Sequence, residues 1–600
     1  MRGNEVRSSL EKHRQMILSK AKRITPSVAA ADVPAAGTSL RNQRSAQLSS
    51  CPRRLSLAGV GMILLAFLTG IAPCTLAAPA GSSRPLAMTP PMGWNDWAHY
   101  QCGYTAQTIL DNANALARTG LAAAGYKTVI IDDCWMQKDR DKEGDLQADP
   151  LRFPNGMKPI GEALHKLGLN FGIYEDAGYL TCDGDAGSGE VNGGGKTYFD
   201  QDARLFASWG VDYLKLDGCR MYVPSGSSPE ASYRKAYAAE SAALKKVNRP
   251  IVFSESAPAY FQGKPEWYDV LRWVGAYGQL WREGSDIANF HLNDPDHPRF
   301  SSVMWNYTYN LQLGRFQKPG NWDDADFIIG GDHGMSMAET RSQLALWSMM
   351  SAPLILSSDV GKLTPQAITI LGSKSVIAID QDRLGRMATL VSRNLEMDLL
   401  FKKLSGGDYA VAVLNRGESP LPVTVDPAEF GFTARKTCNF DARDLWSGRL
   451  QPAASTLQTT VVSHDTALWR IHPSAGCGAP ARTGAITMSN AEASHQPSHY
   501  TRCLASSGEL EDCSGTPAEV WTITPAGALK SGDHCLVVAS GKPVMASCHN
   551  GSARWHYTVL GDLVNDRDHQ CLSAGSAQDI SLKMEACEKG KLEQIWSLPN

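Results

Sequence analysis

The chain has 600 residues and a formal net charge of −3, and it contains 43% hydrophobic and 20% charged residues. These values are typical of a soluble globular protein with several domains. No basic stripe indicates a nucleic-acid partner, and the near-neutral charge points to no other class of partner.

Residues 1–80 are predicted to be an N-terminal extension that carries a secretory signal. A basic, serine-rich region precedes the apolar run Leu55–Pro73, and small residues near Ala78 and Ala80 follow. This order is typical of a cleaved signal. We therefore expect a secreted or periplasmic protein, cut near Ala78–Ala80, without a permanent membrane anchor. An uncleaved anchor is the alternative, which Gly, Thr and Pro in the apolar run disfavour.

Residues 86–385 repeat one pattern. A short apolar strand ends in polar or charged residues, and a helix-like stretch follows, in eight successive units. This repetition predicts a (β/α)8 barrel, with an open doubly wound sheet as the alternative. In such barrels the active site lies at the carboxyl ends of the strands. Acidic residues mark most of the predicted strand ends, namely Asp96, Asp132, Asp133, Asp176, Asp217, Glu255, Asp286, Asp326 and Asp359.

The predicted fourth strand, YLKLDGC at Tyr213–Cys219, ends in two opposite charges. Because side chains alternate along a strand, Lys215 and Asp217 face the same way. An isolated Lys-x-Asp is most often a structural ion pair. In a barrel, however, both side chains point to the mouth, where Lys215 favours the ionised form of Asp217.

A second acid follows the predicted sixth strand, in the stretch WREGSDI. Asp286 and Asp217 would then face one mouth, and a pair of carboxyl groups is what glycoside hydrolysis requires. One group attacks the anomeric carbon, while the other protonates the leaving oxygen and later activates water. We expect Asp286 to hold its proton if Arg282 turns to the substrate.

Two further domains are predicted after the barrel. Residues 386–476 alternate polar and apolar residues between turn signals, which indicates an antiparallel β-domain. Residues 477–498 are small and polar and are interpreted as a linker. Residues 499–600 contain three copies of a unit that opens with Cys-Leu, continues to a second Cys and closes with Trp. This repetition indicates a closed three-fold β-structure.

The cysteine count is compatible with disulfides in a secreted chain. Two of the 14 cysteines, Cys51 and Cys74, precede residue 80, and the remaining 12 could form six bridges. Each repeat of residues 499–600 is expected to pair its own two cysteines, as Cys503–Cys513, Cys535–Cys548 and Cys571–Cys587.

Several long motifs, in chain order, resemble glycoside hydrolase family 27, the family of α-galactosidases and α-N-acetylgalactosaminidases. They are PPMGWNDW, IDDCWM, GIYEDAG, YLKLDGC, WREGSDI and GNWDDADF…SQLALWSMMSAPLILSSDV, within residues 86–475. The resemblance implies an exo-acting, retaining glycosidase that removes terminal α-D-galactosyl residues from oligo- or polysaccharides. Asp217 would be the nucleophile and Asp286 the acid/base. Water is the second substrate, so neither a cofactor nor a metal is expected.

The same resemblance implies which residues hold the sugar. Asp132 and Asp133 match the acids that bind the 4- and 6-hydroxyls of a galactosyl ring, and Trp97 matches the apolar platform beneath it. Tyr174 and Lys215 would be further wall contacts of the sugar site. The resemblance also implies the disulfides Cys102–Cys134 and Cys182–Cys219.

The binding site for the sugar's 2-position departs from the family pattern. Arg282 would donate to the 2- and 3-hydroxyls, oriented by Asp326, but the stretch IVFSESAPAYF lacks the usual Cys-Glu-Trp. Aligned without a gap, Ser256 and Ala259 resemble the N-acetylgalactosaminidase pattern, in which small residues leave room for an acetamido group. Shifted by one residue, Glu255 takes the place of the glutamate that binds the 2-hydroxyl. A regular strand cannot present Glu255 and Ser256 on one face, so the two alignments exclude each other. Other members of the family act on β-L-arabinopyranosides, which keeps that activity open as well.

The last hundred residues resemble a ricin-B-type β-trefoil lectin module, including the Gln-x-Trp signature at Gln594–Trp596. The other two repeats lack this Gln, and no repeat has the Asp that usually follows Cys-Leu. A second glycan bound at the trefoil and a purely structural trefoil therefore both remain open. A non-catalytic carbohydrate-binding protein is the alternative for the whole chain, and the presence of Asp217 and Asp286 argues against it.

Overall fold

The computed structural model describes residues 85–192, 194–287, 299–332, 334–433, 437–489, 501–549, 553–575 and 581–600. The predicted secretory signal lies outside these residues. Within the described ranges, no helix is both long and apolar enough to cross a bilayer.

Eight parallel strands form a barrel in which strands adjacent in the chain pair with each other, and β1 also pairs with β8. The ring closes between β7 and β8, because the backbone N–H of Ile328 donates to Ile355 (2.7 Å) and Ser357 donates back to Ile328 (2.9 Å). The prediction of a (β/α)8 barrel is confirmed, and the open doubly wound sheet is wrong. The strands are β1 (Met92–Asn95), β2 (Thr128–Ile131), β3 (Asn170–Asp176), β4 (Tyr213–Asp217), β5 (Val252–Glu255), β6 (Leu280–Arg282), β7 (Trp322–Asp324) and β8 (Leu354–Leu356).

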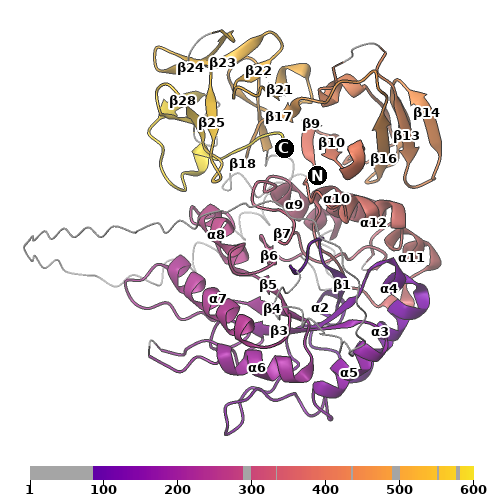
Figure 1. The fold of residues 1–600 in the computed structure, drawn as a ribbon, viewed down its shortest axis with the longest axis vertical. Coiled ribbons are helices and arrows are strands. Elements are labelled where there is room, and N and C mark those ends of the chain that lie inside the picture. The colour runs from indigo at the N-terminus through magenta and orange to yellow at the C-terminus, as the bar shows by residue number, and fades with distance from the viewer. Residues whose placement is uncertain are drawn as a thin grey trace, which may run out of the picture. The chain divides into compact units, whose positions relative to one another are not determined.

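The barrel helices begin and end at residues that cap them. Thr105 and Ser336 form capping boxes at the starts of α3 and α10. Gly210 ends α6 with a φ of 83°, a backbone conformation that favours glycine. Figure 1 shows α3, α5, α6 and α7 outside the strands β1–β5. The helices are α2 (Trp97–Tyr100), α3 (Ala106–Thr119), α4 (Leu121–Ala124), α5 (Lys158–Lys166), α6 (Phe199–Trp209), α7 (Pro229–Lys246), the 3₁₀ turn η1 (Ala257–Phe261), α8 (Trp267–Val274), α9 (Arg299–Asn310), α10 (Met337–Met350), α11 (Pro365–Leu371) and α12 (Lys374–Asp380).

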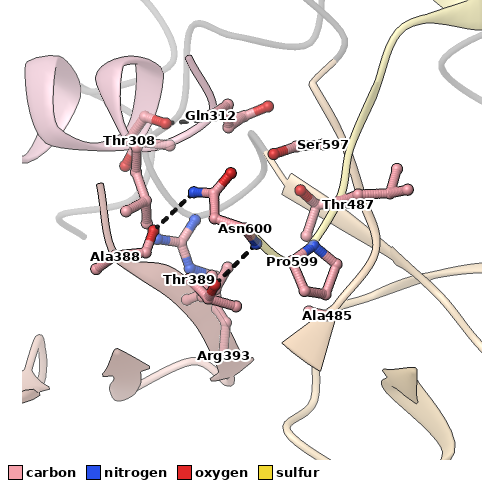
Figure 2. Close-up of a pocket in the computed structure, with 13 residues that line it drawn as sticks. Thr308, Gln312, Ala388, Thr389, Arg393, Ala485, Thr487, Ser597, Pro599 and Asn600 are labelled. Atoms are coloured by element: carbon pink, nitrogen blue, oxygen red, sulfur yellow. Dashed lines mark hydrogen bonds between the residues drawn. The ribbon is translucent and has the colours of Figure 1, made fainter. Parts of the chain in front are cut away.

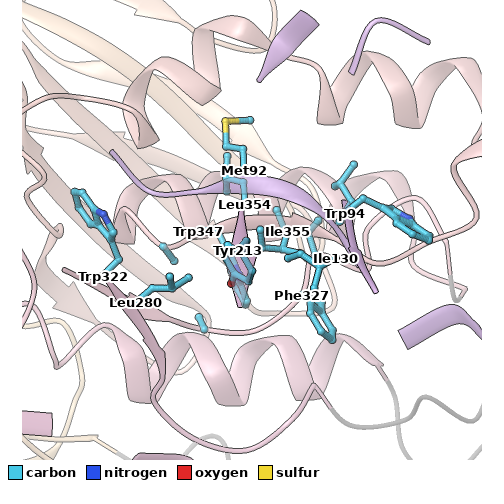
Figure 3. Close-up of a cluster of buried hydrophobic side chains, with 14 of the residues drawn as sticks. Met92, Trp94, Ile130, Tyr213, Leu280, Trp322, Phe327, Trp347, Leu354 and Ile355 are labelled. Atoms are coloured by element: carbon cyan, nitrogen blue, oxygen red, sulfur yellow. The ribbon is translucent and has the colours of Figure 1, made fainter. Parts of the chain in front are cut away.

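Apolar side chains fill the middle of the barrel. Ile130, Tyr213, Leu280 and Ile355 come from four different strands and lie together in Figure 3. Side chains contributed by several strands in this way form the packed interior that such barrels share. The barrel interior is therefore filled by packed apolar side chains. The charged residues lie at the carboxyl ends of the strands.

The β-domain after the barrel is antiparallel, as predicted. A six-stranded sheet, β14-β13-β16-β11-β10-β9, is accompanied by the pair β12-β15. A disulfide that the sequence did not assign, Cys438–Cys477, links this domain's later strands to the following segment. The strands are β9 (Thr389–Arg393), β10 (Met397–Lys403), β11 (Tyr409–Asn415), β12 (Leu421–Val425), β13 (Phe440–Asp444), β14 (Leu450–Ala454), β15 (Leu457–Val461) and β16 (Thr466–Pro473).

The C-terminal repeats share one internal contact, which confirms the predicted three-fold plan. The indole N–H of Trp521 donates to the carbonyl of Leu504 (2.6 Å), and Trp555 and Trp596 make the equivalent contacts at 2.9 Å. The three predicted disulfides of the repeats are present. The strands are β17 (Arg482–Ala485), β18 (Thr487–Ser489), β19 (Thr501–Leu504), β20 (Leu510–Asp512), β21 (Val520–Ile523), β22 (Leu529–Ser531), β23 (His534–Ala539), β24 (Lys542–Ser547), β25 (Trp555–Tyr557), β26 (Leu563–Asn565), β27 (Cys571–Ala574), β28 (Leu582–Glu585) and β29 (Trp596–Ser597).

The linker prediction is wrong for residues 482–489. The strand β17 pairs with β21, and β18 pairs with β19 and β29, so both belong to the trefoil sheets. These strands have three or four residues each and contain small side chains, which is why their composition is typical of a linker. The end of the chain packs nearby, where the backbone N–H of Asn600 donates to Thr389 Oγ1 at 2.9 Å (Figure 2).

Candidate active site

Side chains from neighbouring strands converge at the carboxyl end of the barrel. The strand register aligns Tyr174 with Lys215 and Ser254, and Asp176 with Asp217. Residues aligned across parallel strands share a face of the sheet. This face therefore carries the acid and the lysine of the fourth strand, as their alternation predicts.

Asp217 ends β4 inside a ring of polar contacts. Its Oδ1 accepts hydrogen bonds from the hydroxyl of Tyr260 and from the backbone N–H of Gly218 (3.0 Å). Its Oδ2 lies 3.7 Å from the sulfur of Cys182. Burial raises the pKa of Asp217 above its ordinary value, while Lys215 and the Tyr260 hydrogen bond act in the opposite direction.

Lys215 makes its hydrogen bond to a residue from another strand end. Its Nζ donates to Oδ2 of Asp132 at 2.7 Å and lies 5.2 Å from the centre of the Tyr174 ring. The isolated ion pair within Lys-x-Asp is therefore not what the structure contains. Lys215 acts on Asp217 through its charge, and it is hydrogen-bonded to Asp132, the first acid after β2.

The two acids after β2 are buried and differ in their contacts. Asp132 accepts from Lys215, from Nδ2 of Asn95 (2.6 Å) and from the backbone N–H of Asp133 (2.9 Å). Asp133 accepts from the backbone N–H groups of Cys134 (2.8 Å) and Asp183 (3.0 Å). Burial raises the pKa of Asp133 to about 6. Asp132 is thus hydrogen-bonded to Lys215, whereas Asp133 also contacts the loop that contains Cys182.

Asp286 lies on the loop after β6 and presents its side chain to solvent. Its side chain is 64% exposed, against 7% for Arg282, whose Nη2 donates to Asp286 Oδ1 at 3.0 Å. Nη1 of Arg282 lies 3.1 Å from Oδ1 of Asp326, as expected for an acid that orients this arginine. Arg282 therefore contacts both acids, and its turn towards a bound sugar stays a prediction. The Nε of Arg282 is buried and has no hydrogen-bond partner among the described residues.

The alignment that places Glu255 in the site is wrong. Glu255 is aligned with Leu216 and Trp281, one residue out of step with Lys215 and Ser254, so its side chain faces the helix layer. Gly278 lies beside its carboxylate, and burial raises its pKa well above the ordinary value. The alternation of side chains along the strand cannot choose between the two alignments. The pairing of β5 with β4 decides which residue faces the site.

Ser256 and Ala259 follow β5 on the turn that leads into the site. The backbone N–H of Ser256 donates to Leu216 at 3.1 Å, and Ala259 belongs to η1, one residue before Tyr260. The gapless alignment, which places Ser256 and Ala259 near the 2-position, stays a prediction. Ser256, Ala257 and Ala259 have small side chains, whereas Tyr260 and Phe261 on the same turn are large.

The two predicted aromatic contacts are also at the strand ends. Trp97 starts α2, directly after β1, and its backbone N–H donates to Oδ1 of Asn95 at 2.7 Å. Tyr174 is buried, and its hydroxyl lies 3.4 Å from the sulfur of Cys182. Asn95 thus contacts both the Trp97 backbone and Asp132, which links the proposed platform to the proposed hydroxyl-binding acid.

Sequence reasoning missed Tyr260 and Asn95. Tyr260 contacts Asp217 and also lies 3.1 Å from the sulfur of Cys219, beside the Cys182–Cys219 disulfide. This bridge and Cys102–Cys134 are both present, as the resemblance implied. The signal for Tyr260 was available, since an aromatic hydroxyl follows the fifth predicted strand in APAYF.

Three groups of acids and cysteines within the described ranges bring their possible ligand atoms within 4.8 Å of one another. One contains Asp176, Asp217, Cys182 and Cys219, and the other two include Cys134. Every one of these cysteines is disulfide-bonded, and metal ions bind the thiolate form of cysteine. The donor sets therefore do not fit a metal site.

Comparison with known proteins finds a matching family for each of the three domains after residue 88. The family described as "Alpha galactosidase A" matches residues 89–382, "Alpha galactosidase C-terminal beta sandwich domain" matches 395–471, and "Ricin-type beta-trefoil lectin domain" matches 495–596. The alpha-galactosidase A of Aspergillus niger is 35% identical over 86% of this chain and 92% of its own length. Alpha-galactosidase 2 of Arabidopsis thaliana is 35% identical over 60% of this chain and 83% of its own. The crystal structure of alpha-galactosidase I from Mortierella vinacea superposes with a TM-score of 0.57 at 30% identity, covering 65% of this chain and 98% of that one.

Proposed function

We propose, because this chain belongs to the alpha-galactosidase A family, that it hydrolyses terminal non-reducing α-D-galactosyl residues with retention of configuration. One observation carries the proposal: two carboxyl groups lie at one barrel mouth in opposite environments. Asp217 is enclosed by Lys215 and Tyr260, whereas Asp286 is 64% exposed on the loop after β6. A retaining glycosidase needs one carboxylate fixed for attack and one that exchanges protons with leaving group and water.

The reaction follows from these two positions. Asp217 attacks the anomeric carbon while Asp286 protonates the leaving oxygen, and a covalent galactosyl-enzyme forms. Asp286 then removes a proton from water, which displaces Asp217 and releases galactose. Tyr260 and the N–H of Gly218 hold one oxygen of Asp217, which leaves the other for attack.

The sugar is held by side chains already joined to this centre. Asp132 is the acceptor for an axial 4-hydroxyl and Asp133 for the 6-hydroxyl, with Trp97 as the apolar platform. Arg282, supported by Asp326, donates to the 2- and 3-hydroxyls. Tyr174 closes the wall beside Lys215.

A second candidate activity, removal of terminal α-N-acetylgalactosamine, is favoured by one observation. Glu255 faces away from the site, and the turn that replaces it carries Ser256 and Ala259. Both side chains are short, and an acetamido group at the 2-position needs room. β-L-Arabinopyranosides, which lack the 6-hydroxymethyl group, are the third sugar to compare.

The 2-position is tested by comparing kcat/KM on p-nitrophenyl α-D-galactopyranoside, its 2-acetamido analogue and the β-L-arabinopyranoside. We expect the galactoside to be preferred, with measurable turnover of the acetamido sugar because Ser256 and Ala259 leave space. Glu255→Gln should leave the ratio between the sugars within about two-fold, since that carboxylate lies behind the strand. A ratio that changes about ten-fold in Glu255→Gln would place this residue in the sugar site after all.

The acid limb of the pH profile should move in opposite directions in two variants. Only ionised Asp217 attacks, so kcat/KM falls as the pH decreases through its pKa. Lys215 lowers the pKa of Asp217 and Asp132 raises it. Lys215→Met should therefore move the acid limb to higher pH, and Asp132→Asn should move it to lower pH. Profiles of kcat/KM between about pH 3 and pH 8 measure both shifts. Acid limbs that move in the same direction in both variants would contradict the proposed effects of Lys215 and Asp132 on the pKa of Asp217.

We also propose that the protein is exported and acts outside the cytoplasm. Six disulfides join cysteines in all three parts of the described chain, and such bridges persist in oxidising compartments. A second glycan at the trefoil stays a proposal. Gln594 does not support it, because its buried amide is bonded to the backbone of Glu588 and Ala586.

A further inference from the structure

We propose that Gln262 is a positioning residue for Asp286, and that the segment Tyr260–Gln262 sets the spacing between the two catalytic carboxyl groups. The inference rests on the proposed function, because it assumes that Asp217 and Asp286 are those groups. It concerns a residue that touches neither the substrate nor the reacting atoms.

The segment contacts both catalytic groups within three residues. The hydroxyl of Tyr260 donates to Asp217. Two residues later, Oε1 of Gln262 accepts from the backbone N–H (2.9 Å) and from the hydroxyl (2.6 Å) of Ser285, the residue before Asp286. One short stretch therefore connects the end of β4 to the loop after β6.

Gly284 allows the Gln262 amide to approach this loop closely. A Cβ atom at Gly284 would lie 2.1 Å from Nε2 and 2.4 Å from Cδ of Gln262. Any side chain at Gly284 would thus displace the amide from Ser285. Nε2 itself is buried without a hydrogen-bond partner among the described residues, which is a cost that folding alone does not explain.

Asp286 depends on its backbone for its position. Its exposed side chain has one hydrogen bond in the described structure, from Arg282, which the sugar would also use. The backbone around it is held by side chains instead: Asn306 donates to the carbonyl of Ser285 (3.0 Å), and Asp326 accepts from the N–H of Ile287 (2.6 Å). Gln262 accepts from the N–H of Ser285, which comes just before these two contacts along the backbone.

The spacing of the carboxyl groups decides how the reaction proceeds. Retaining enzymes hold them roughly 5 Å apart, and a misplacement of about 1 Å can cost on the order of 100-fold in rate. Without Gln262 the loop should still fold, since Asn306 and Asp326 remain. Proton donation by Asp286 should nevertheless become poorly aligned, while attack by Asp217 is preserved.

The test compares Gln262→Met on two galactosides. Methyl α-D-galactoside needs protonation of its leaving group, whereas α-galactosyl fluoride releases fluoride with little assistance. We expect kcat/KM to fall roughly 10- to 100-fold on the methyl glycoside and less than about three-fold on the fluoride. Gln262→Glu, which keeps an oxygen at the Ser285 contact, should recover part of the loss.

Matched controls separate positioning from general damage. Gln381→Met makes the same change at a glutamine bonded to Pro90, on the other face of the barrel. This variant should keep the wild-type kcat/KM on both substrates. An equal loss on both substrates in Gln262→Met, with unchanged Tm, would overturn the proposal. If Asp286→Ala itself shows no dependence on the leaving group, the assignment of Asp286 fails instead, and the proposal about Gln262 fails with it.

Discussion

Asp217→Asn should abolish hydrolysis of α-galactosides, with kcat lower by about 10⁴-fold or more, as expected when a covalent nucleophile is lost. The amide keeps the size of the side chain and can still accept from Gly218 and Tyr260. It cannot form the galactosyl ester. Binding of galactose, measured by calorimetry, should persist.

The exposed acid Asp139 provides the matched control, since Asp139→Asn makes the same chemical change at a solvent-exposed position of the loop after β2. A wild-type rate in Asp217→Asn would exclude this residue as the nucleophile. Loss of hydrolysis with retained binding would also exclude the alternative that the chain only binds carbohydrate.

The second large effect is expected from Asp286→Ala. Because general acid catalysis contributes roughly 10²- to 10⁴-fold, kcat/KM on methyl α-D-galactoside should fall by about 10³-fold. On α-galactosyl fluoride, kcat/KM should change little, while kcat falls because no base activates the water of the second step. Added azide needs no base, so it should restore turnover and give α-galactosyl azide.

The configuration of the azide product distinguishes the two carboxyl groups. With Asp217→Ala, azide would take the place of the missing nucleophile and give the β-galactosyl azide by a single inversion. The same product from both variants would contradict the assigned roles. The measurement is an NMR assignment of the anomeric proton.

Local sequence rules predicted those parts of the site that depend on one strand at a time. Alternation along Tyr213–Asp217 placed Lys215 and Asp217 on one face, and the structure agrees. The same rule could not place Glu255, because two alignments were self-consistent and only the pairing of β5 with β4 and β6 chooses between them.

Contacts between distant segments were beyond such rules. The partner of Lys215 is Asp132, 83 residues earlier, and the hydroxyl that bonds Asp217 comes from a 3₁₀ turn after the next strand. Polar groups on loops are satisfied by whichever element lies nearest in space, which periodicity does not report. The strands at residues 482–489 were missed for a related reason, since their pairing with β21 and β29 is long-range.

The central claim is that Asp217 forms the covalent bond to galactose, and trapping that bond tests it most directly. A fluorinated galactosyl fluoride that forms the ester faster than water cleaves it should add one sugar mass to the protein. Peptide mapping should then find the label on the peptide that contains Tyr213–Cys219, at Asp217. A label on Asp286 or on another carboxylate, or turnover without any labelled enzyme, would contradict the account.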